Sequence, residues 1–401
     1  MRDFMGLNVH TVTFRPELYA PVTRQVRDYH PFVWDVGQET DYALHFPMAR
    51  NGVDWGSLYG SWRKAGYRID ASVQVDPVKP ASWKDAARDA FAYGKAFAVS
   101  FGPSSSGLVE SFEVGNEPGG YADDVYRTVF ENMARGAREG DPRLLVSACA
   151  SNLGKSGKYS KSVDCLAGLE ALYDIVNIHI YPEVEGWPTW RRSFPEDPKI
   201  NFLRDIGHVL AWRDEHVPEK QVWLTEFGYD ASTKPHPETG DFARWEGSTE
   251  LQQAQWTVRA FLTLAATKLD RAYLFYFNDD DEPHVHGSSG LTRKYQPKPA
   301  FYAVAHLQLV LGGFRFARVV REDATMHIYE FLSEDGRQRI WATWKLAGDA
   351  EPINLDLNGA AVAEAVRMPL AAGAAEAVEV HTTNGTATVT VGATPVYLWL
   401  E

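Results

Sequence analysis

The sequence predicts an α/β protein: a (β/α)8 TIM barrel followed by a small antiparallel β-sandwich. Three observations lead to this fold. From residue 6 to about 312, short apolar runs alternate with amphipathic segments, as strands and helices do around a parallel sheet. Eight such pairs can be counted, whereas a doubly wound sheet usually has fewer strands and a phosphate-binding loop after the first one. After Gly312-Gly313 the apolar residues follow a period of two, which is typical of antiparallel strands.

The eight expected barrel strands are short, apolar runs, most of them bounded by polar or turn-forming residues. They are Gly6–His10, Phe32–Gly37, Arg68–Val75, Val109–Glu117, Leu144–Ala150, Ile175–Tyr181, Gln221–Phe227 and Arg271–Asn278.

Segments with apolar residues at helical spacing lie between these runs. Asp123–Arg138 places Val125, Val129 and Met133 at that spacing, with acids in its first turn. Further helices are expected at Phe202–Glu215, at Glu250–Thr267 and, closing the barrel, at Gln296–Val310.

The pattern change divides the chain into a barrel at residues 1–312 and a C-terminal β-sandwich at residues 313–401. The sandwich strands are expected at Arg315–Val320, Met326–Leu332, Arg339–Lys345, Pro352–Leu357, Ala377–Thr382, Thr386–Val391 and Pro395–Leu400. They carry no cluster of catalytic residue types, so packing against the barrel is favoured over carbohydrate binding as their role.

Composition excludes several classes of function. The net charge of −13 argues against nucleic acid or an anionic membrane surface as a partner. No apolar run approaches the roughly 20 residues that span a bilayer. We find no Walker loop, no dinucleotide-binding glycine motif and no zinc-finger cysteines, so no cofactor is predicted. Asp279–Glu282 with His284 and His286 is acid-rich but meets no ligand spacing, so no metal is predicted either.

The start of the chain, Met1 to His10, does not resemble a signal peptide. We therefore expect a cytoplasmic protein, or a secreted or periplasmic one whose export signal has been removed. The spacing of Cys149 and Cys165 leaves open whether they pair, and the oligomeric state stays open as well.

Barrel enzymes carry their chemistry at the C-terminal ends of the strands. At these ends the sequence places Asn8 and His10, Trp34 and Asp35, Gln74 and Asp76, Asn116 and Glu117, Ser151 and Asn152, His179 and Tyr181, Glu226, and Tyr276 and Asn278. The pair Glu117 and Glu226 is the most informative, because glycosidic bond cleavage uses one protonated and one ionised carboxyl group. The aromatic share of 13% suits a protein that stacks on sugar rings, although core packing accounts for many aromatics.

Three motifs then occur in a fixed order. They are Asn116-Glu117-Pro118 on the fourth expected strand, His179-Ile180-Tyr181 on the sixth and Thr225-Glu226-Phe227-Gly228 on the seventh. Together they resemble the glycoside hydrolases of clan A, the retaining barrel superfamily that includes families 5 and 39. The stretches Gly290-Leu291-Thr292 and Pro297-Lys298-Pro299-Ala300-Phe301-Tyr302 also resemble the closing segment of many such barrels. The resemblance covers the barrel.

The resemblance implies a role for each matching residue. Glu117 would be the general acid/base, and Glu226 the nucleophile. Asn116 would hydrogen-bond the sugar 2-hydroxyl, Tyr181 would orient Glu226, and His179 would line the same pocket. Further substrate contacts are expected from Asn8, His10, Asp35, Asn152, Trp187, Tyr276 and Asn278.

Two positions depart from the clan's pattern. Tyr276-Phe277-Asn278 stands where many members have a Trp under the sugar, so Tyr276 is expected to replace that platform. The second expected strand ends in Trp34 and Asp35 with no Arg, where family 5 carries one, which favours a family 39-like member. The loop around Trp187 fits either a stacking platform or a packed lid.

The sequence therefore predicts a retaining glycoside hydrolase that cleaves β-linked poly- or oligosaccharides by double displacement. Two alternatives remain. One is a transglycosylase that uses the same residues, and the other is a catalytically silent glycan-binding protein.

Overall fold

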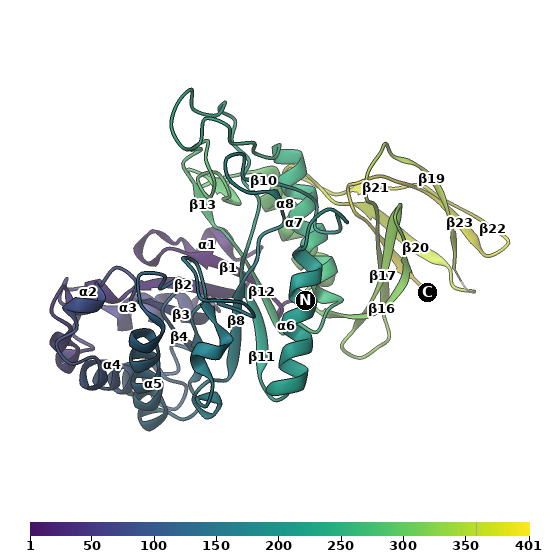
Figure 1. Cartoon of the computed structure of the whole chain (residues 1–401). Helices are drawn as coiled ribbons and strands as arrows, with labels where there is room; N and C mark the ends of the chain where they lie inside the picture. The colour runs from purple at the N-terminus through teal and green to yellow at the C-terminus, as the bar shows by residue number, and fades with distance from the viewer. Residues whose placement is uncertain (358) are drawn as a thin grey trace.

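The computed structural model describes residues 1–357 and 359–401. Its first part is a closed barrel of eight parallel strands (Figure 1). In chain order these are β1 (Met5–Val9), β2 (Gln25–Pro31), β3 (Arg68–Gln74), β4 (Ser111–Val114), β5 (Leu145–Ala148), β8 (Ile175–His179), β11 (Gln221–Phe227) and β12 (Arg271–Leu274). Pairing of β1 with both β2 and β12 closes the ring. The predicted fold class, barrel plus β-sandwich, is confirmed.

The prediction of the second barrel strand, Phe32–Gly37, is wrong. Phe32–Val36 forms the short helix α2, and the strand at this place in the barrel is β2, which pairs with both β1 and β3. All seven residues of β2 are buried, although Arg27, Asp28 and His30 are polar. The reason for the error is physical: where a strand faces a polar site, its buried residues no longer form an apolar run.

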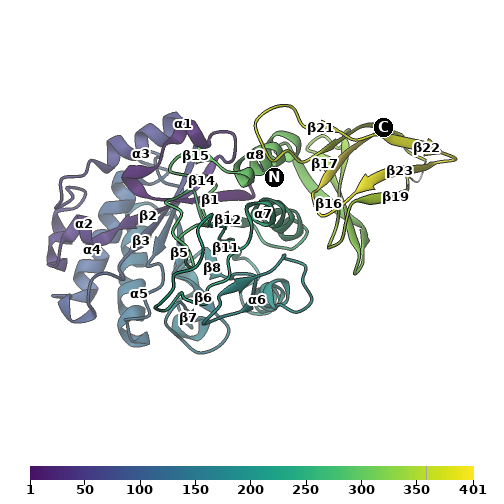
Figure 2. The ribbon, with the colours of Figure 1, turned by 90° about the horizontal axis from the view of Figure 1, so that it is seen from above.

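Helices cover the outside of the barrel (Figures 1 and 2). They are α1 (Pro16–Tyr19), α2 (Phe32–Val36), α3 (Trp55–Lys64), α4 (Ala86–Phe101), α5 (Asp123–Gly140), α6 (Phe202–His216), α7 (Glu250–Ala265) and α8 (Pro299–Leu311). Side-chain caps fix several starts, as in the capping box of Thr249 and Gln252 on α7. Glycine allows α4 and α5 to pack closely, because a Cβ on Gly94 would lie 2.0 Å from the carbonyl oxygen of Met133. None of the helices in the described residues could span a membrane.

Short strands shape three loops at the C-terminal end of the barrel. The loop after β5 contains β6 (Ser151–Asn152) and β7 (Lys161–Ser162), and the loop after β8 contains β9 (Glu183–Glu185) and β10 (Arg191–Arg192). The segment after β12 contains β13 (Asn278–Asp279), β14 (Thr292–Arg293) and β15 (Gln296–Pro297). These pairings give the loops around the candidate site a defined path.

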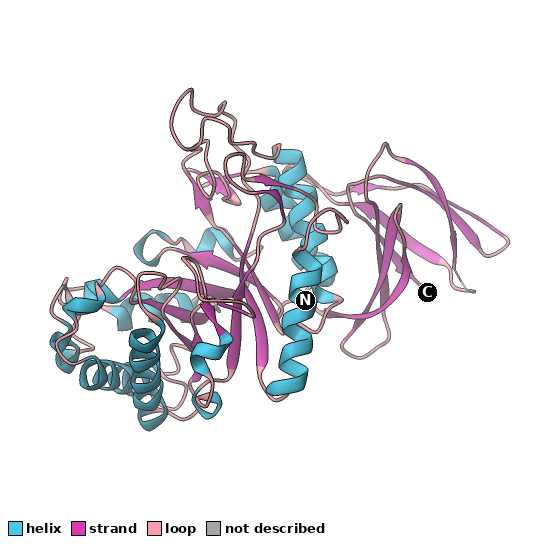
Figure 3. Ribbon diagram, viewed as in Figure 1, coloured by secondary structure: helices cyan, strands magenta, loops and turns pink. Residues whose placement is uncertain are grey.

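The C-terminal part is built from two antiparallel sheets, whose strands are magenta in Figure 3. The larger contains β16 (Phe314–Glu322), β17 (Met326–Ser333), β18 (Arg339–Lys345), β24 (Val396–Leu400), β20 (Val362–Arg367) and β21 (Glu376–Ala377), and the smaller β19 (Glu351–Asp356), β23 (Thr386–Val391) and β22 (Val380–Thr383). Strand β20 was not predicted. Residues from both sheets, among them Trp341, Leu355 and Val389, form one buried cluster. The division that we propose between residues 312 and 313 falls between α8 and β16.

The larger sheet also packs against the barrel, beside α7 and α8 (Figure 2). Tyr329, Phe331 and Trp344 belong to the same buried cluster as the barrel core. A buried ion pair reinforces this contact: Arg259 on α7 donates to Glu196, at 2.6 and 3.0 Å, and the indole of Trp344 donates to the same carboxylate at 2.7 Å. Both cysteines are buried and unpaired.

Candidate active site

The two glutamates singled out above meet at the C-terminal end of the barrel. Glu226 is the sixth residue of β11, and Glu117 follows β4. His179, at the end of β8, lies between them: its Nδ1 is 2.9 Å from Oε1 of Glu117 and 3.6 Å from Oε1 of Glu226. One carboxylate oxygen from each glutamate and a ring nitrogen of His179 all lie within 4.8 Å of one another. The two carboxyl groups are thus close enough to act on one bond.

A pocket of about 340 Å³ opens over these carboxylates. It is lined by His10, Tyr29, Gln74, Asn116, Glu117, Glu226, Phe275, Tyr276 and His286. The mixture of aromatic rings with a few amide and carboxylate groups is the composition that suits a sugar ring, which has apolar faces and polar edges.

The two carboxyl groups have different surroundings. Glu226 is 5% exposed, and its oxygens accept hydrogen bonds from the hydroxyls of Tyr29, at 2.6 Å, and Tyr181, at 2.9 Å. Burial alone would raise the pKa of Glu226, but the charges of His179 and Arg27 and the Tyr29 hydrogen bond outweigh it and lower that pKa to about 2. Glu226 is therefore ionised near neutral pH. The side chain of Glu117 is more open, at 26% exposed against 7% for the side chain of Glu226.

Arg27, on β2, holds the base of the site together. Its guanidinium is fully buried and makes a two-pronged contact with Glu113, at 2.7 and 2.8 Å. The third nitrogen, Nη1, donates to Asn8 and, at 3.1 Å, to Glu226. Nη2, one of the two nitrogens that bind Glu113, also donates to Ser72 and, at 2.7 Å, to Oδ1 of Asn116. A single side chain thereby links β1, β2, β3, β4 and β11.

Asn116 is fixed from two directions. Its side-chain oxygen accepts from Arg27, and its backbone N–H donates to the carboxylate of Asp76 at 3.1 Å. Because Oδ1 is engaged below, the amide N–H2 of Asn116 is the group left to donate to another acceptor. This orientation suits a hydrogen bond to a hydroxyl group in the pocket.

Because the second barrel strand is β2 and not Phe32–Gly37, this strand brings residues to the site other than those predicted. Arg27 and Tyr29 belong to β2 and point into the site, and neither was predicted. Because β2 contains Arg27, a missing Arg on the second strand no longer favours a family 39-like member over a family 5-like one. A lone Arg within the strand-like run Gln25–Pro31 was the available signal.

Asp35 does not lie at a strand end. It belongs to α2 and is fully buried, where its carboxylate accepts from Trp55 at 2.6 Å and from Tyr93 at 2.6 Å, and lies 2.7 Å from Nε2 of His30. These contacts use the carboxylate inside the protein, away from the residues that line the pocket.

Three predicted asparagines have their side chains engaged with the protein. Asn8 is fully buried and donates to the carbonyl oxygens of Thr225 and Leu274 while it accepts from Arg27. Asn152 binds groups of its own loop. Asn278 accepts from Thr292 and from the backbone of Tyr295. The structure thus gives these residues partners other than a substrate.

Of the other predicted contacts, His10 and Tyr276 line the pocket, and Tyr181 and His179 contact the two carboxylates. Trp187 lies on the loop after β8, where it is 71% exposed and is not among the pocket-lining residues. His286, which lines the pocket, was not predicted as a substrate contact; burial lowers its pKa, and its ring lies 4.9 Å from that of Tyr181.

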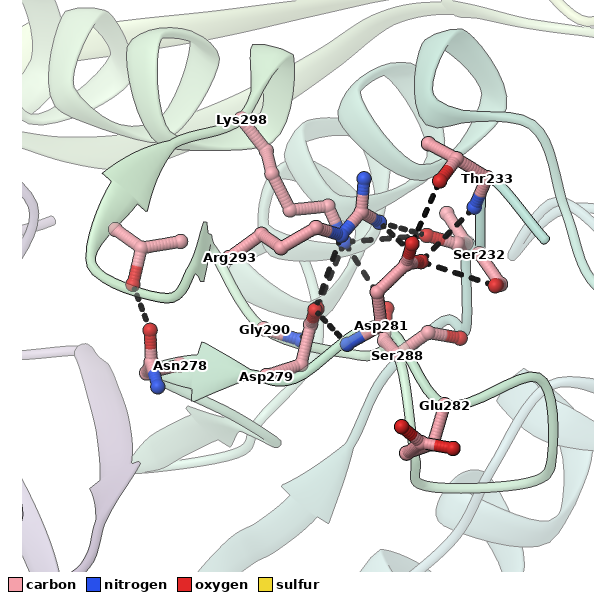
Figure 4. A network of polar contacts seen from close by, with 12 residues as sticks. Ser232, Thr233, Asn278, Asp279, Asp281, Glu282, Ser288, Gly290, Arg293 and Lys298 are labelled. Atoms are coloured by element: carbon pink, nitrogen blue, oxygen red, sulfur yellow. Dashed lines mark hydrogen bonds and ion pairs between the residues drawn. The ribbon is translucent and has the colours of Figure 1, made fainter.

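A polar network anchors the segment that carries His286 (Figure 4). The buried ammonium of Lys298 donates to Asp279 at 3.0 Å, and Arg293 contacts Asp279 at 3.3 Å and Asp281 at 3.2 Å. Asp281 also accepts from Ser232 and Thr233, on the loop after β11. Asp279 and Asp281 of the acid-rich tract are therefore paired with cations and hydroxyls of the protein. Among the described residues, the group able to hold a metal ion is Glu117, His179 and Glu226.

The chain was compared with known proteins. No family model matches it, and no curated protein matches it by sequence. Solved structures match it along nearly its whole length. A glucosidase from Croceicoccus marinus has a TM-score of 0.70 at 12% identity, covering 100% of this chain and 96% of its own. A family 51 α-L-arabinofuranosidase from Bifidobacterium longum has a TM-score of 0.61 at 14% identity, with 96% and 89% covered.

A third match is a GH30 endoxylanase from Clostridium papyrosolvens, with a TM-score of 0.59 at 12% identity and 99% and 96% of the two chains covered. At these identities the likeness concerns the fold. The chain therefore shares its whole architecture, barrel and C-terminal β domain together, with structures of enzymes that act on glycosides.

Proposed function

We propose that this protein is a retaining glycoside hydrolase that cleaves β-linked poly- or oligosaccharides. The observation that carries the proposal is the pair Glu117 and Glu226, which bring one carboxylate oxygen each to within 4.8 Å of the other, under a pocket whose lining suits a sugar ring. Retaining enzymes hold their carboxyl groups roughly 5–5.5 Å apart, whereas inverting enzymes need about 6.5–9.5 Å for a water molecule.

The surroundings of each carboxyl group suit its role. Glu226, ionised and held by Tyr29 and Tyr181, acts as the nucleophile and forms a glycosyl ester. Glu117 protonates the departing glycosidic oxygen. Once Glu226 is esterified, Glu117 takes a proton from water, which attacks the same carbon and releases the sugar. Asn116 donates to the 2-hydroxyl, and the ring of Tyr276 forms part of the pocket wall.

The lining of the pocket favours a neutral sugar. None of its nine described residues is Lys or Arg, while two are glutamates. A uronic acid would bring a further carboxylate next to these without a cation to pair with, which costs free energy. Neutral β-glucans, xylans, mannans and galactans are therefore the preferred candidates over acidic polysaccharides.

The test is release of reducing ends by the wild-type protein from β-glucans, xylans, mannans, galactans and acidic polysaccharides, beside the isosteric Glu226→Gln variant. We expect release from one neutral glycan and its loss in Glu226→Gln. NMR of the first anomer formed should show retained configuration. Undiminished release by Glu226→Gln, or an inverted first product, would contradict the mechanism, whereas products longer than the substrate would indicate a transglycosylase.

A further inference from the structure

The loop after β5, residues 150–162, is braced as a closed unit. Its two ends pair through β6 and β7, with Asn152 opposite Ser162. Inside the loop, the side chain of Asn152 donates to Ser160 at 2.6 Å and to the carbonyl oxygen of Lys155, and it accepts from the backbone of Gly154 at 2.7 Å. These bonds give the tip of the loop a fixed place.

That place is against the turn that carries Glu117. At the base of the loop, the backbone N–H of Ala150 donates to the carbonyl oxygen of Asn116 at 3.0 Å. At its tip, Lys158 touches the turn itself: a Cβ on Gly119 would lie 2.1 Å from the carbonyl oxygen of Lys158. The two backbones are thus in direct contact, two residues beyond Glu117.

The tip presents an aromatic ring and a cation to solvent. Tyr159 is 52% exposed, and the ammonium group of Lys158 lies 4.8 Å from the centre of its ring. The pKa of Lys158 is raised by Tyr159 and also by the charge of Glu117. An exposed ring with a hydrogen-bond donor at its side is a suitable surface for a sugar residue.

The chemistry of the site decides which sugar residue that is. A general acid donates its proton to the glycosidic oxygen, so the departing part of the substrate lies on the side of the acid. We infer that Lys158 and Tyr159 form the leaving-group subsite, in which the departing sugar residue stacks on Tyr159 and Lys158 donates to its hydroxyls. This inference rests on the proposed role of Glu117 as acid/base.

The subsite also has a role in the second step. When a sugar hydroxyl instead of water attacks the glycosyl ester, it enters along the path by which the leaving group departed. Lys158 and Tyr159 would then hold the acceptor sugar, so their removal lowers any transfer to sugars relative to hydrolysis.

The experiment compares two substrates with the same sugar in the pocket: an oligosaccharide of the glycan that the wild-type protein cleaves, and the corresponding β-glycosyl fluoride, whose leaving group is a single atom. Tyr159→Ala should lower kcat/KM for the oligosaccharide by about three- to tenfold. The same variant should leave kcat/KM for the fluoride within about twofold of wild type. Tyr159→Phe, which keeps the ring, should retain activity on both.

Leu153→Ala is the matched control, since Leu153 is an exposed apolar residue of the same loop, at 40%. It should leave both substrates unaffected. Equal losses on the two substrates in Tyr159→Ala would overturn the inference, because the residue would then act on the part of the site that both substrates occupy. Equal losses on the oligosaccharide and on a third substrate, the corresponding methyl β-glycoside, which needs the acid but has no sugar as its leaving group, would also overturn it, because the residue would then act through the position of Glu117. Unchanged oligosaccharide cleavage would overturn it as well. A wild-type protein that cleaves neither the glycans nor the fluorides would refute the proposed function itself, before any variant is compared.

Discussion

At the scale of single residues, the candidate site separates two carboxyl groups by their hydrogen-bond donors. Glu226 receives three donors, from Arg27, Tyr29 and Tyr181, whereas Glu117 faces His179 and the pocket. Donors aimed at a carboxylate stabilise its ionised form. The same arrangement that keeps Glu226 charged therefore sets how the protein responds to acid.

The pH dependence of activity should reflect this. Glu226 stays ionised until its lowered pKa is reached, so we expect the acid limb of kcat/KM to lie below about pH 4. In Tyr29→Phe one donor to the ionised form is lost, the pKa of Glu226 rises, and the limb moves to higher pH. The profile is measured with the β-glycosyl fluoride, whose departure needs little help from an acid. A limb that stays in place in Tyr29→Phe would show that Tyr29 does not set the charge of Glu226.

A second prediction concerns Glu113, which shares Arg27 with Glu226. When Glu226 becomes an ester, Glu113 remains as the charge that balances the buried guanidinium. In Glu113→Gln, Arg27 pairs with Glu226 alone, which makes the nucleophile less reactive and leaves a buried cation unbalanced in the intermediate. We expect kcat/KM to fall by roughly ten- to a hundredfold.

Glu110→Gln is the control for this effect. Glu110 precedes β4 and pairs with Arg68 and Arg271, away from the pocket. Its loss should reduce the melting temperature without changing the kinetic constants. If both variants lost activity in proportion to their loss of stability, Glu113 would have no role in catalysis beyond its contribution to stability.

At the scale of elements, the segment between β10 and α6 connects the barrel rim to the C-terminal sheet. Glu196 belongs to this segment, and its carboxylate receives Arg259 of α7 and Trp344 of β18, with side-chain exposures of only 3% for Glu196 and 1% for Arg259. Removing one partner of a buried ion pair leaves the other unsatisfied. The contact therefore joins three elements that are far apart in the sequence.

We expect Glu196→Ala to reduce the free energy of unfolding by about 3–5 kcal/mol. Urea denaturation followed by tryptophan fluorescence measures this change. The exposed pair of Lys95 and Glu139 provides the comparison: Glu139→Ala should cost less than about 1 kcal/mol, because solvent screens an exposed pair. Similar values for the two variants would mean that the buried pair contributes no more than a surface one.

At the scale of the whole molecule, regular patterning made the fold predictable. Seven barrel strands have apolar runs that the sequence displays, and the period-two pattern after residue 312 indicates the sheets that follow. The exceptions are β2, whose buried face is polar, and β20, whose sequence Val-Ala-Glu-Ala-Val-Arg includes two charged residues. In both, tertiary surroundings outweigh local pattern.

The residues of the candidate site that stand in sequence motifs could be predicted. Glu117, His179 and Glu226 stand in motifs at strand ends, and they lie together in the structure. Arg27 and Tyr29 were missed with their strand. His286 was missed because it lies in a loop, which is placed by ion pairs such as Lys298 with Asp279 that no local pattern displays. The direction of side chains such as Asn8, which faces the protein interior, also depends on partners distant in sequence.

The many contacts of Arg27 have a consequence for how the protein folds. Its partners come from strands that include the first and the seventh of the barrel, and its bond to Glu226 spans 199 residues. A partly formed barrel lacks some of these partners, so the full set of Arg27 hydrogen bonds cannot form before the barrel has closed. Recovery of activity during refolding would then follow the final closure step, while the return of helical circular dichroism would report the earlier growth of the individual units.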